Sequence, residues 1–220
     1  MAMQATRSIP IVFAGSNDPV AMGLVRSLAR PEGNVTGIAI AAGPEIAGKR
    51  LELLKAMIPA AKRVASFITG GDSAEATGQA AAQLKLESTV LRAENSEQLD
   101  EAFARVTRER PDGLVVAGPG FLGTQTPRLV AFAAERRLPA VYAFPEAVDA
   151  GGLASFGIDF LDLNRRAADY VNRILRGAKP SELPVELPRK FEVALNLKTA
   201  RSLGIRIPQS VLLRADRVVE

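Results

Sequence analysis

Residues 138–159 read LPAVYAFPEAVDAGGLASFGID, and this stretch decides the fold of the 220-residue chain. Two apolar runs, residues 141–144 and 153–156, have the length and composition of buried strands. The loop between them contains Pro145 and the pair Gly151-Gly152, which interrupt regular structure. The stretch therefore predicts a strand, a loop and a second strand, and we expect the loop to carry function.

A helix follows this stretch. In residues 161–177, LDLNRRAADYVNRILRG, apolar side chains recur near the helical period, and Gly177 predicts its end. Asp159 stands where this helix begins. Its carboxylate either caps free backbone N–H groups or contacts a ligand, and the sequence leaves both roles open.

The preceding chain repeats one unit, a strand followed by a polar loop and a helix. Helical patterns fill most of the intervals, with Ser96 a candidate cap for residues 96–109. Alternating strands and helices are typical of parallel sheets with helices on both faces, so the predicted class is α/β. The predicted strands are residues 9–14, 35–40, 64–68, 87–91 and 113–117, and the predicted helices are residues 20–31, 48–59, 73–84, 96–109 and 129–137.

Composition excludes several classes of function. The chain has no histidine and no cysteine, which removes Ser-His-Asp and Cys-His catalysis, cysteine-linked zinc sites and disulfides. Neither a phosphate-binding glycine fingerprint nor a metal-ligand pattern is present, so we expect no cofactor, no metal and no catalytic residue. The charge of +4 is dispersed, and 5% aromatic residues are too few for base stacking, so nucleic acid is not an expected partner. The basic residues interpreted as solvated helix faces are Arg26, Lys49, Arg50, Arg63, Arg108, Arg136 and Arg165.

Right-handed crossovers bring the loops after parallel strands to one edge of a sheet, which is where ligands bind in such folds. Glycines there allow close backbone approach, and helix starts after Pro19 and Asp72 offer N–H groups to a carboxylate. Residues of these types also form simple turns and caps, which is the alternative reading. The candidate ligand-binding residues are Ser16, Asn17, Asp18, Thr69, Gly70, Gly71, Asp72, Gly118, Pro119, Phe144, Glu146 and Asp159.

Several long segments resemble one known family. They are residues 9–37, 48–65, 138–186 and 190–208, and they are similar to substrate-binding proteins of bacterial ABC importers of the tryptophan/tyrosine type. The resemblance implies a type I periplasmic-binding fold with two doubly wound parallel-sheet lobes and an interlobe cleft. It also implies a small ligand, an amino acid or related carboxylate, and an ABC permease as partner. The expected domains are a partial lobe one (1–47, with 159–177 crossing back), lobe two (48–158) and a C-terminal segment that wraps across the body (178–220).

The chain departs from this family at its start. Members begin with an export signal and a further stretch that builds the first strands of lobe one, so we expect this first lobe to be incomplete and the chain to be a fragment or a truncated gene product. Residues 35–40 would then pair on one side only, and the open edge would favour a homodimer. Full-length members are periplasmic or membrane-anchored outside the cytoplasm. MAMQATRSIP has no hydrophobic leader, and the chain as written would stay in the cytoplasm.

Two other classes of function remain open from the residues. One is a cytoplasmic ligand-sensing or regulatory domain of the same fold, although no helix-turn-helix segment precedes Ile9. The other is an enzyme that uses Asp72, Glu146 or Asp159 as acid and base. A truncated fragment without function is a further alternative.

Overall fold

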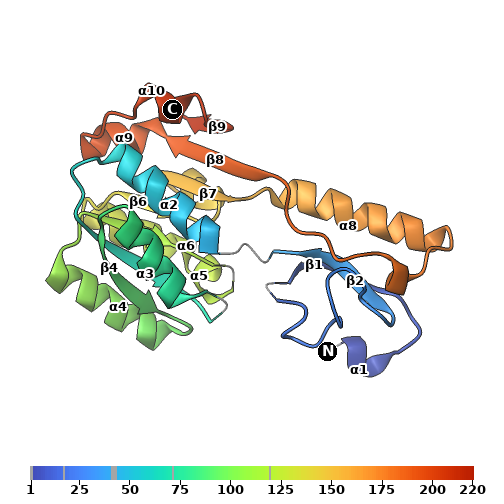
Figure 1. Ribbon diagram of the computed structural model, residues 1–220. Helices are drawn as coiled ribbons and strands as arrows, with labels where there is room; N and C mark the ends of the chain where they lie inside the picture. The colour runs from blue at the N-terminus through green and yellow to red at the C-terminus, as the bar shows by residue number, and fades with distance from the viewer. Residues whose placement is uncertain (1, 17, 41–43, 71, 119) are drawn as a thin grey trace. The chain divides into compact units, whose positions relative to one another are not determined.

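The computed structural model describes residues 2–16, 18–40, 44–70, 72–118 and 120–220. The chain forms two compact α/β units, shown in Figure 1. Unit 1 contains Met1–Gly43 and Ile158–Phe191, and unit 2 contains Pro44–Gly157 and Glu192–Glu220. The chain therefore starts in unit 1, builds most of unit 2, returns to unit 1 over Ile158–Phe191, and ends in unit 2.

Unit 1 is built on two parallel strands, β1 (Ile11–Ser16) and β2 (Val35–Ala39), with Ile11 paired to Val35. The helix α8 (Phe160–Leu175) lies along both strands (Figure 1). Ile38 of β2 and Tyr170 of α8 meet in a buried cluster. The short elements α1 (Ala2–Ala5) and η1 (Pro180–Glu182) complete the unit. The helix predicted after Asp159 is confirmed, and burial of its apolar face explains its position.

The segment after η1 runs beside β2. The amide of Ala39 donates to the carbonyl of Glu186 across 2.8 Å, and the Thr36 hydroxyl donates to the carbonyl of Leu183 across 2.7 Å. The Tyr170 hydroxyl donates to the carbonyl of Pro184 across 2.6 Å. The prediction that residues 35–40 pair on one side only is therefore wrong, because a distant part of the chain supplies the second partner.

The helix predicted over residues 20–31 does not form, and the chain makes turns there instead. Gly23 has a φ of +66°, outside the range of a right-handed helix. The amides of Leu24 and Val25 both donate to the carbonyl of Pro19, at 2.8 and 3.2 Å. The apolar spacing predicted a helix, but the left-handed glycine interrupts it. Since the helix is absent, its predicted N-terminus after Pro19 cannot serve as an anion site.

Unit 2 contains a seven-stranded sheet in the order β4-β3-β5-β6-β7-β8-β9. Its described pairings, such as Val64 to Gly113 and Leu114 to Ala140, are parallel. The strands are β3 (Arg63–Ile68), β4 (Glu87–Arg92), β5 (Gly113–Val116), β6 (Ala140–Tyr142), β7 (Ala154–Ile158, of which Ile158 is counted with unit 1), β8 (Phe191–Asn196, of which Phe191 is counted with unit 1) and β9 (Arg217–Val219).

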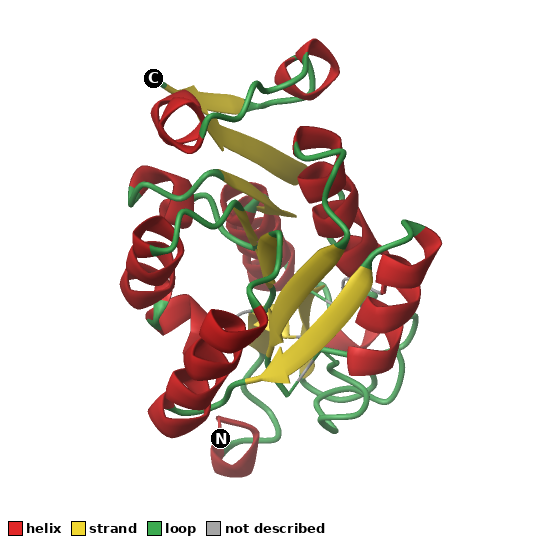
Figure 2. Cartoon of the chain, turned by 90° about the vertical axis from the view of Figure 1, so that its left-hand side faces the viewer, coloured by secondary structure: helices red, strands yellow, loops and turns green. Residues whose placement is uncertain are grey.

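Helices cover both faces of this sheet (Figures 1 and 2). Val64 and Val115 pack on one face, against Leu54 and other apolar residues of α2. Phe67 and Val116 pack on the other face with residues of α4 and α6. This division explains why the strands are apolar on both faces, as expected for a covered parallel sheet. The helices of unit 2 are α2 (Pro44–Met57), α3 (Ala74–Gln83), α4 (Ser96–Glu109), α5 (Phe121–Thr124), α6 (Thr126–Glu135), α7 (Glu146–Asp149), α9 (Leu197–Leu203) and α10 (Gln209–Leu212).

The C-terminal chain differs from the single wrapping segment predicted for residues 178–220. Residues through Phe191 pack with unit 1, whereas the chain from Glu192 onward joins unit 2. There β8 and β9 extend the sheet as a parallel pair in which Ala194 pairs with Arg217. The Asp216 carboxylate adds to this pairing by accepting a hydrogen bond from the amide of Val193 at 2.8 Å. Figure 2 shows the C-terminus at the end of β9, the outermost strand. Asn95 rather than Ser96 caps α4, with its side chain accepting from the amide of Gln98. Among the described residues, no helix is long and apolar enough to cross a membrane.

Candidate functional site

The loop after β3 and the loop after β5 meet at the carboxyl edge of the unit 2 sheet. Asp72 Oδ2 accepts hydrogen bonds from the amide and the hydroxyl of Thr69, at 2.9 and 3.2 Å. Gly118, with a φ of +76°, lies against both residues: a Cβ there would be 2.6 Å from Asp72 Oδ2 and 2.7 Å from Thr69 Oγ1. Only glycine fits this position without moving the loop. Three predicted site residues are thus held together.

The guanidinium group of Arg92, at the end of β4, bonds to the loop that contains Asp72. Arg92 Nη1 donates to the carbonyl of Thr69 across 3.0 Å and lies 3.4 Å from Glu94 Oε1. A Cβ on Gly70 would lie 3.0 Å from that Glu94 oxygen. The arginine side chain is about half exposed, at 44%. An exposed ion pair of Arg92 and Glu94 therefore lies beside the loop.

Arg50 brings a second guanidinium toward this edge. Its Nε donates to the carbonyl of Phe156 in β7 across 2.9 Å, and only 7% of the residue is exposed. Burial lowers the pKa of Arg50 to about 10, and the nearby carboxylate of Asp72 opposes that shift. The interpretation of Arg50 as part of a solvated helix face is wrong. Arg50 shares a helical face with Leu53, Leu54 and Met57, so the spacing was a signal that could have shown its burial.

The chain after β6 supplies Phe144 and Glu146 at the same edge, because β6 is parallel and adjacent to β5. Phe144 is half-buried, and its ring would lie 3.5 Å from a Cβ on Gly123. Glu146 is exposed and begins the four-residue helix α7. An aromatic ring and a carboxylate therefore lie at the same edge of the sheet as Gly118, which follows the neighbouring strand β5.

The remaining described candidates belong to unit 1. Asp18 Oδ1 accepts from the amide of Ala21, and Asp159 Oδ1 accepts from the amide of Asp162, each at 2.9 Å. Asp159 is therefore the cap of α8, one of its two predicted roles. The hydroxyl of Ser16 contacts the sulfur of Met22 at 3.6 Å. In both aspartates one carboxylate oxygen organises a turn or a helix start. Asn17, Gly71 and Pro119 lie outside the described residues.

The site has the chemistry of a binding surface. In the part of the chain that the structure describes, no three acidic side chains gather as a metal site would require. At the unit 2 edge, Arg92 offers a guanidinium, Glu146 a carboxylate and Phe144 an aromatic ring. Gly118 lets the backbone approach a ligand closely. These groups suit recognition of a small polar molecule.

The chain belongs to the family of ABC transporter substrate binding proteins. The family's model matches residues 1–219. The class of protein, the α/β fold and the resemblance seen in the sequence are therefore confirmed. The family consists of binding proteins that recognise small molecules.

Individual relatives agree with the family. The chain is 27% identical over 210 residues to the "Tyrosine-binding protein" of Clostridioides difficile, which covers 93% of this chain and 60% of the relative. The chain thus spans about three fifths of that curated relative. It is 28% identical to the ABC domain of Streptococcus pneumoniae solved in complex with L-Trp, with a TM-score of 0.85 over 99% of this chain and 76% of the other. A conserved domain protein of Vibrio cholerae is also 28% identical, with a TM-score of 0.86 over 99% and 74% of the two chains.

Proposed function

We propose that this chain is the solute-binding component of an ABC-type importer and binds a small carboxylate-bearing molecule such as an amino acid. The observation that carries the proposal is the family match across residues 1–219. One relative is named for tyrosine and another was solved with L-Trp, so aromatic amino acids are the first ligands to test. In this proposal the protein recognises its ligand without transforming it.

The unit 2 edge supports the choice of ligand class. The guanidinium of Arg92 is accessible beside the Thr69 carbonyl, and the buried charge of Arg50 lies behind the same loop. The exposed guanidinium of Arg92 can donate charged hydrogen bonds to a ligand carboxylate at this edge. The exposed carboxylate of Glu146 suits an ammonium group, and the ring of Phe144 offers an apolar surface to a side chain. Together these groups complement the two charges and the side chain of an amino acid.

The unit 1 candidates Ser16, Asp18 and Asp159 stay predictions within this proposal. The ABC permease as partner and the location outside the cytoplasm that full-length members of the family have also stay predictions.

Binding to the edge is tested with one variant and a matched control. Glu146→Gln removes a carboxylate of the proposed site, and Glu97→Gln removes an equally exposed carboxylate in the first turn of α4. A thermal-shift series with L-tyrosine, L-tryptophan and other amino acids identifies the ligand, and titration then gives its affinity. We expect Glu146→Gln to weaken binding by about tenfold and Glu97→Gln to leave it unchanged. Equal affinities for both variants and the unaltered chain would remove Glu146 from the site.

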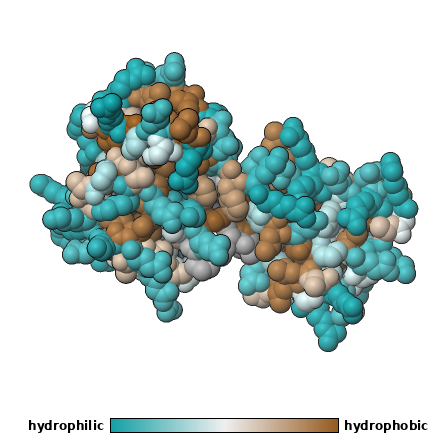
Figure 3. All heavy atoms as spheres, turned by 45° about the horizontal axis from the view of Figure 1, so that its top comes forward, coloured by the Kyte–Doolittle hydropathy of each residue, from teal (hydrophilic) through white to brown (hydrophobic). Residues whose placement is uncertain are grey.

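The homodimer expected from the sequence also stays a proposal. Apolar side chains reach the surface on the face that Figure 3 presents, and Ile9 and Met22 of unit 1 are 65% and 53% exposed. Such side chains favour self-association when they gather in one patch. Sedimentation velocity over a hundredfold range of concentration tests this, and a constant monomer would contradict it.

A further inference from the structure

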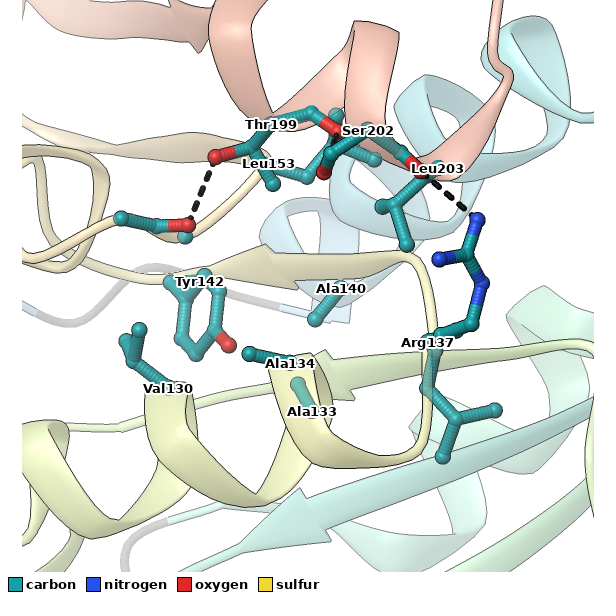
Figure 4. Close-up of a pocket in the computed structure, with 13 residues that line it drawn as sticks. Val130, Ala133, Ala134, Arg137, Ala140, Tyr142, Leu153, Thr199, Ser202 and Leu203 are labelled. Atoms are coloured by element: carbon teal, nitrogen blue, oxygen red, sulfur yellow. Dashed lines mark hydrogen bonds between the residues drawn. The ribbon is translucent and has the colours of Figure 1, made fainter.

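A second cavity lies in unit 2 at the opposite edge of the sheet from the candidate site. It is bounded by α6, by the starts of β6 and β7, and by α9 (Figure 4). Its volume is about 130 Å³. Ala140 begins β6 and Leu153 precedes β7, so the cavity faces the amino ends of these strands. The strand-end loops with Asp72, Gly118 and Phe144 are at the carboxyl ends.

The wall of the cavity contains a buried hydroxyl group without a partner. Tyr142 is 3% exposed, and its hydroxyl makes no hydrogen bond to any described residue. Figure 4 shows this hydroxyl pointing toward Ala134 of α6, which lines the cavity. Gly152 permits the ring's position, since a Cβ there would lie 2.7 Å from Tyr142 Cε2. An unsatisfied buried hydroxyl is costly, and a ligand that bonds to it would recover that cost.

The other residues that line the cavity define the kind of molecule that it can bind. Val130, Ala133 and Leu153 are buried and form an apolar floor. The polar groups at the rim are already engaged: the Thr199 hydroxyl donates to the carbonyl of Gly151 at 2.9 Å, and Arg137 Nη2 donates to the carbonyl of Ser202 at 2.7 Å. Both bonds appear as dashed lines in Figure 4. The Ser202 hydroxyl, also in the lining, donates to the carbonyl of Thr199 at 2.8 Å. The lining therefore combines apolar walls with one hydroxyl, that of Tyr142, that has no partner among the described residues.

We propose that this cavity is a second binding site, for a small neutral molecule of about the size of phenol that presents one hydrogen-bonding group to Tyr142. The volume supports this size, because an engineered apolar cavity of about 150 Å³ binds benzene. Burial raises the pKa of Tyr142 above its ordinary value, so the hydroxyl stays protonated at neutral pH and able to donate. The site is separate from the amino acid site proposed above.

The probe for the experiment is 4-fluorophenol, followed by ¹⁹F NMR during titration into the intact chain. Ala134 is exposed on α6 and lines the cavity, so Ala134→Leu fills the mouth with little effect on folding. Ala131 is exposed on the same helix and is not among the residues that line this cavity, so Ala131→Leu is the matched control. We expect saturable binding that Ala134→Leu abolishes and Ala131→Leu preserves. Tyr142→Phe keeps the shape and should weaken binding by about three- to tenfold through loss of one hydrogen bond.

Absence of saturable binding up to about 10 mM probe, the range of weak fragment affinity, would overturn the proposal. Binding that Ala134→Leu leaves unchanged, or that Tyr142→Phe does not weaken, would overturn it as well. Addition of a saturating amino acid should not displace the probe, whereas competitive displacement would place the probe at the other edge and contradict a second site.

Discussion

The side chain of Arg50 in α2 donates a hydrogen bond from Nε to the carbonyl oxygen of Phe156 in β7, across 2.9 Å. This bond connects α2, the first helix of unit 2, to β7, the last strand of the segment Pro44–Gly157. Phe156 is one residue before the end of that segment. Gly157 permits this arrangement, since a Cβ there would fall 1.8 Å from the carbonyl oxygen of Ala143. The bond fixes the end of β7 beside the carboxyl edge of the sheet.

Arg50→Ala should therefore destabilise unit 2. The change removes a buried charged donor and leaves the Phe156 carbonyl without it, at a cost of about 2–3 kcal/mol. Lys49→Ala is the control, because Lys49 is half-exposed and pairs at the surface with Glu52. It should cost no more than about 0.5 kcal/mol. Urea denaturation measures both values, and equal losses would show that the buried bond contributes nothing of its own.

Gly118→Ala should damage the loop that contains Asp72 more than Gly204→Ala damages its own surroundings. Both glycines have positive φ angles, +76° and +74°, and an added Cβ at Gly204 meets nothing within 4 Å, so that variant incurs only the conformational strain of about 1 kcal/mol. Only at Gly118 does the added Cβ meet Asp72 and Thr69, which should cost about 1–3 kcal/mol more. We also expect Gly118→Ala alone to weaken ligand binding. If both variants lose the same stability and affinity, the close contact has no importance for the loop.

Tyr142→Phe should raise the free energy of unfolding by about 1 kcal/mol in the absence of ligand. The variant removes a buried hydroxyl that lacks a hydrogen-bond partner among the described residues and retains the packed ring. Thermal and urea denaturation both report the change. A loss of stability would indicate that the hydroxyl is satisfied in the native protein.

Asp112 should contribute stability that depends on pH. Hydrogen bonds from the amides of Arg63 and Lys62, at 2.9 and 2.8 Å, lower the pKa of its carboxyl group. The folded state therefore favours the ionised form. Its contribution is complete above the unfolded-state pKa of about 3.9 and is lost as pH falls through the lower folded-state value.

The measurement compares Asp112→Ala with the unaltered chain by urea denaturation from pH 7 to pH 2. The stability difference should be constant from pH 7 to about pH 5 and shrink below about pH 4. Asp169→Asn, on the exposed side of α8, is the control. A difference that persists unchanged at pH 2 would assign the effect of Asp112 to packing.

The sequence predicted the sheet of unit 2 well where the pattern was local. Residues 64–68 and 113–117 are apolar runs before turn residues, and the structure places β3 and β5 there. The β8 and β9 strands were not predicted as members of that sheet, because their place depends on contacts such as Val193 with Asp216. No local periodicity reports a pairing partner that lies 23 residues away.

The candidate site likewise contains residues that the local sequence predicted and one that it did not. Asp72, Thr69 and Gly118 could be predicted because each follows a strand, and parallel strands bring such loops to one edge. The buried Arg50 was missed, since basic residues on helices are usually solvated. Asp18 and Asp159 were predicted as ligand-binding candidates, and in each the structure shows one oxygen bonded to a local amide.

The central claim is that this chain binds a small molecule by recognising the carboxylate group of that molecule. Calorimetric titration tests the claim most directly. L-tyrosine and L-tryptophan should be titrated beside tyramine and tryptamine, which have the same side chains and ammonium groups but no carboxylate. The account predicts saturable binding of at least one amino acid and affinity at least about tenfold weaker for its amine, because a charged hydrogen bond is lost. Equal affinity for amine and amino acid, or no saturable binding by any amino acid, would contradict it.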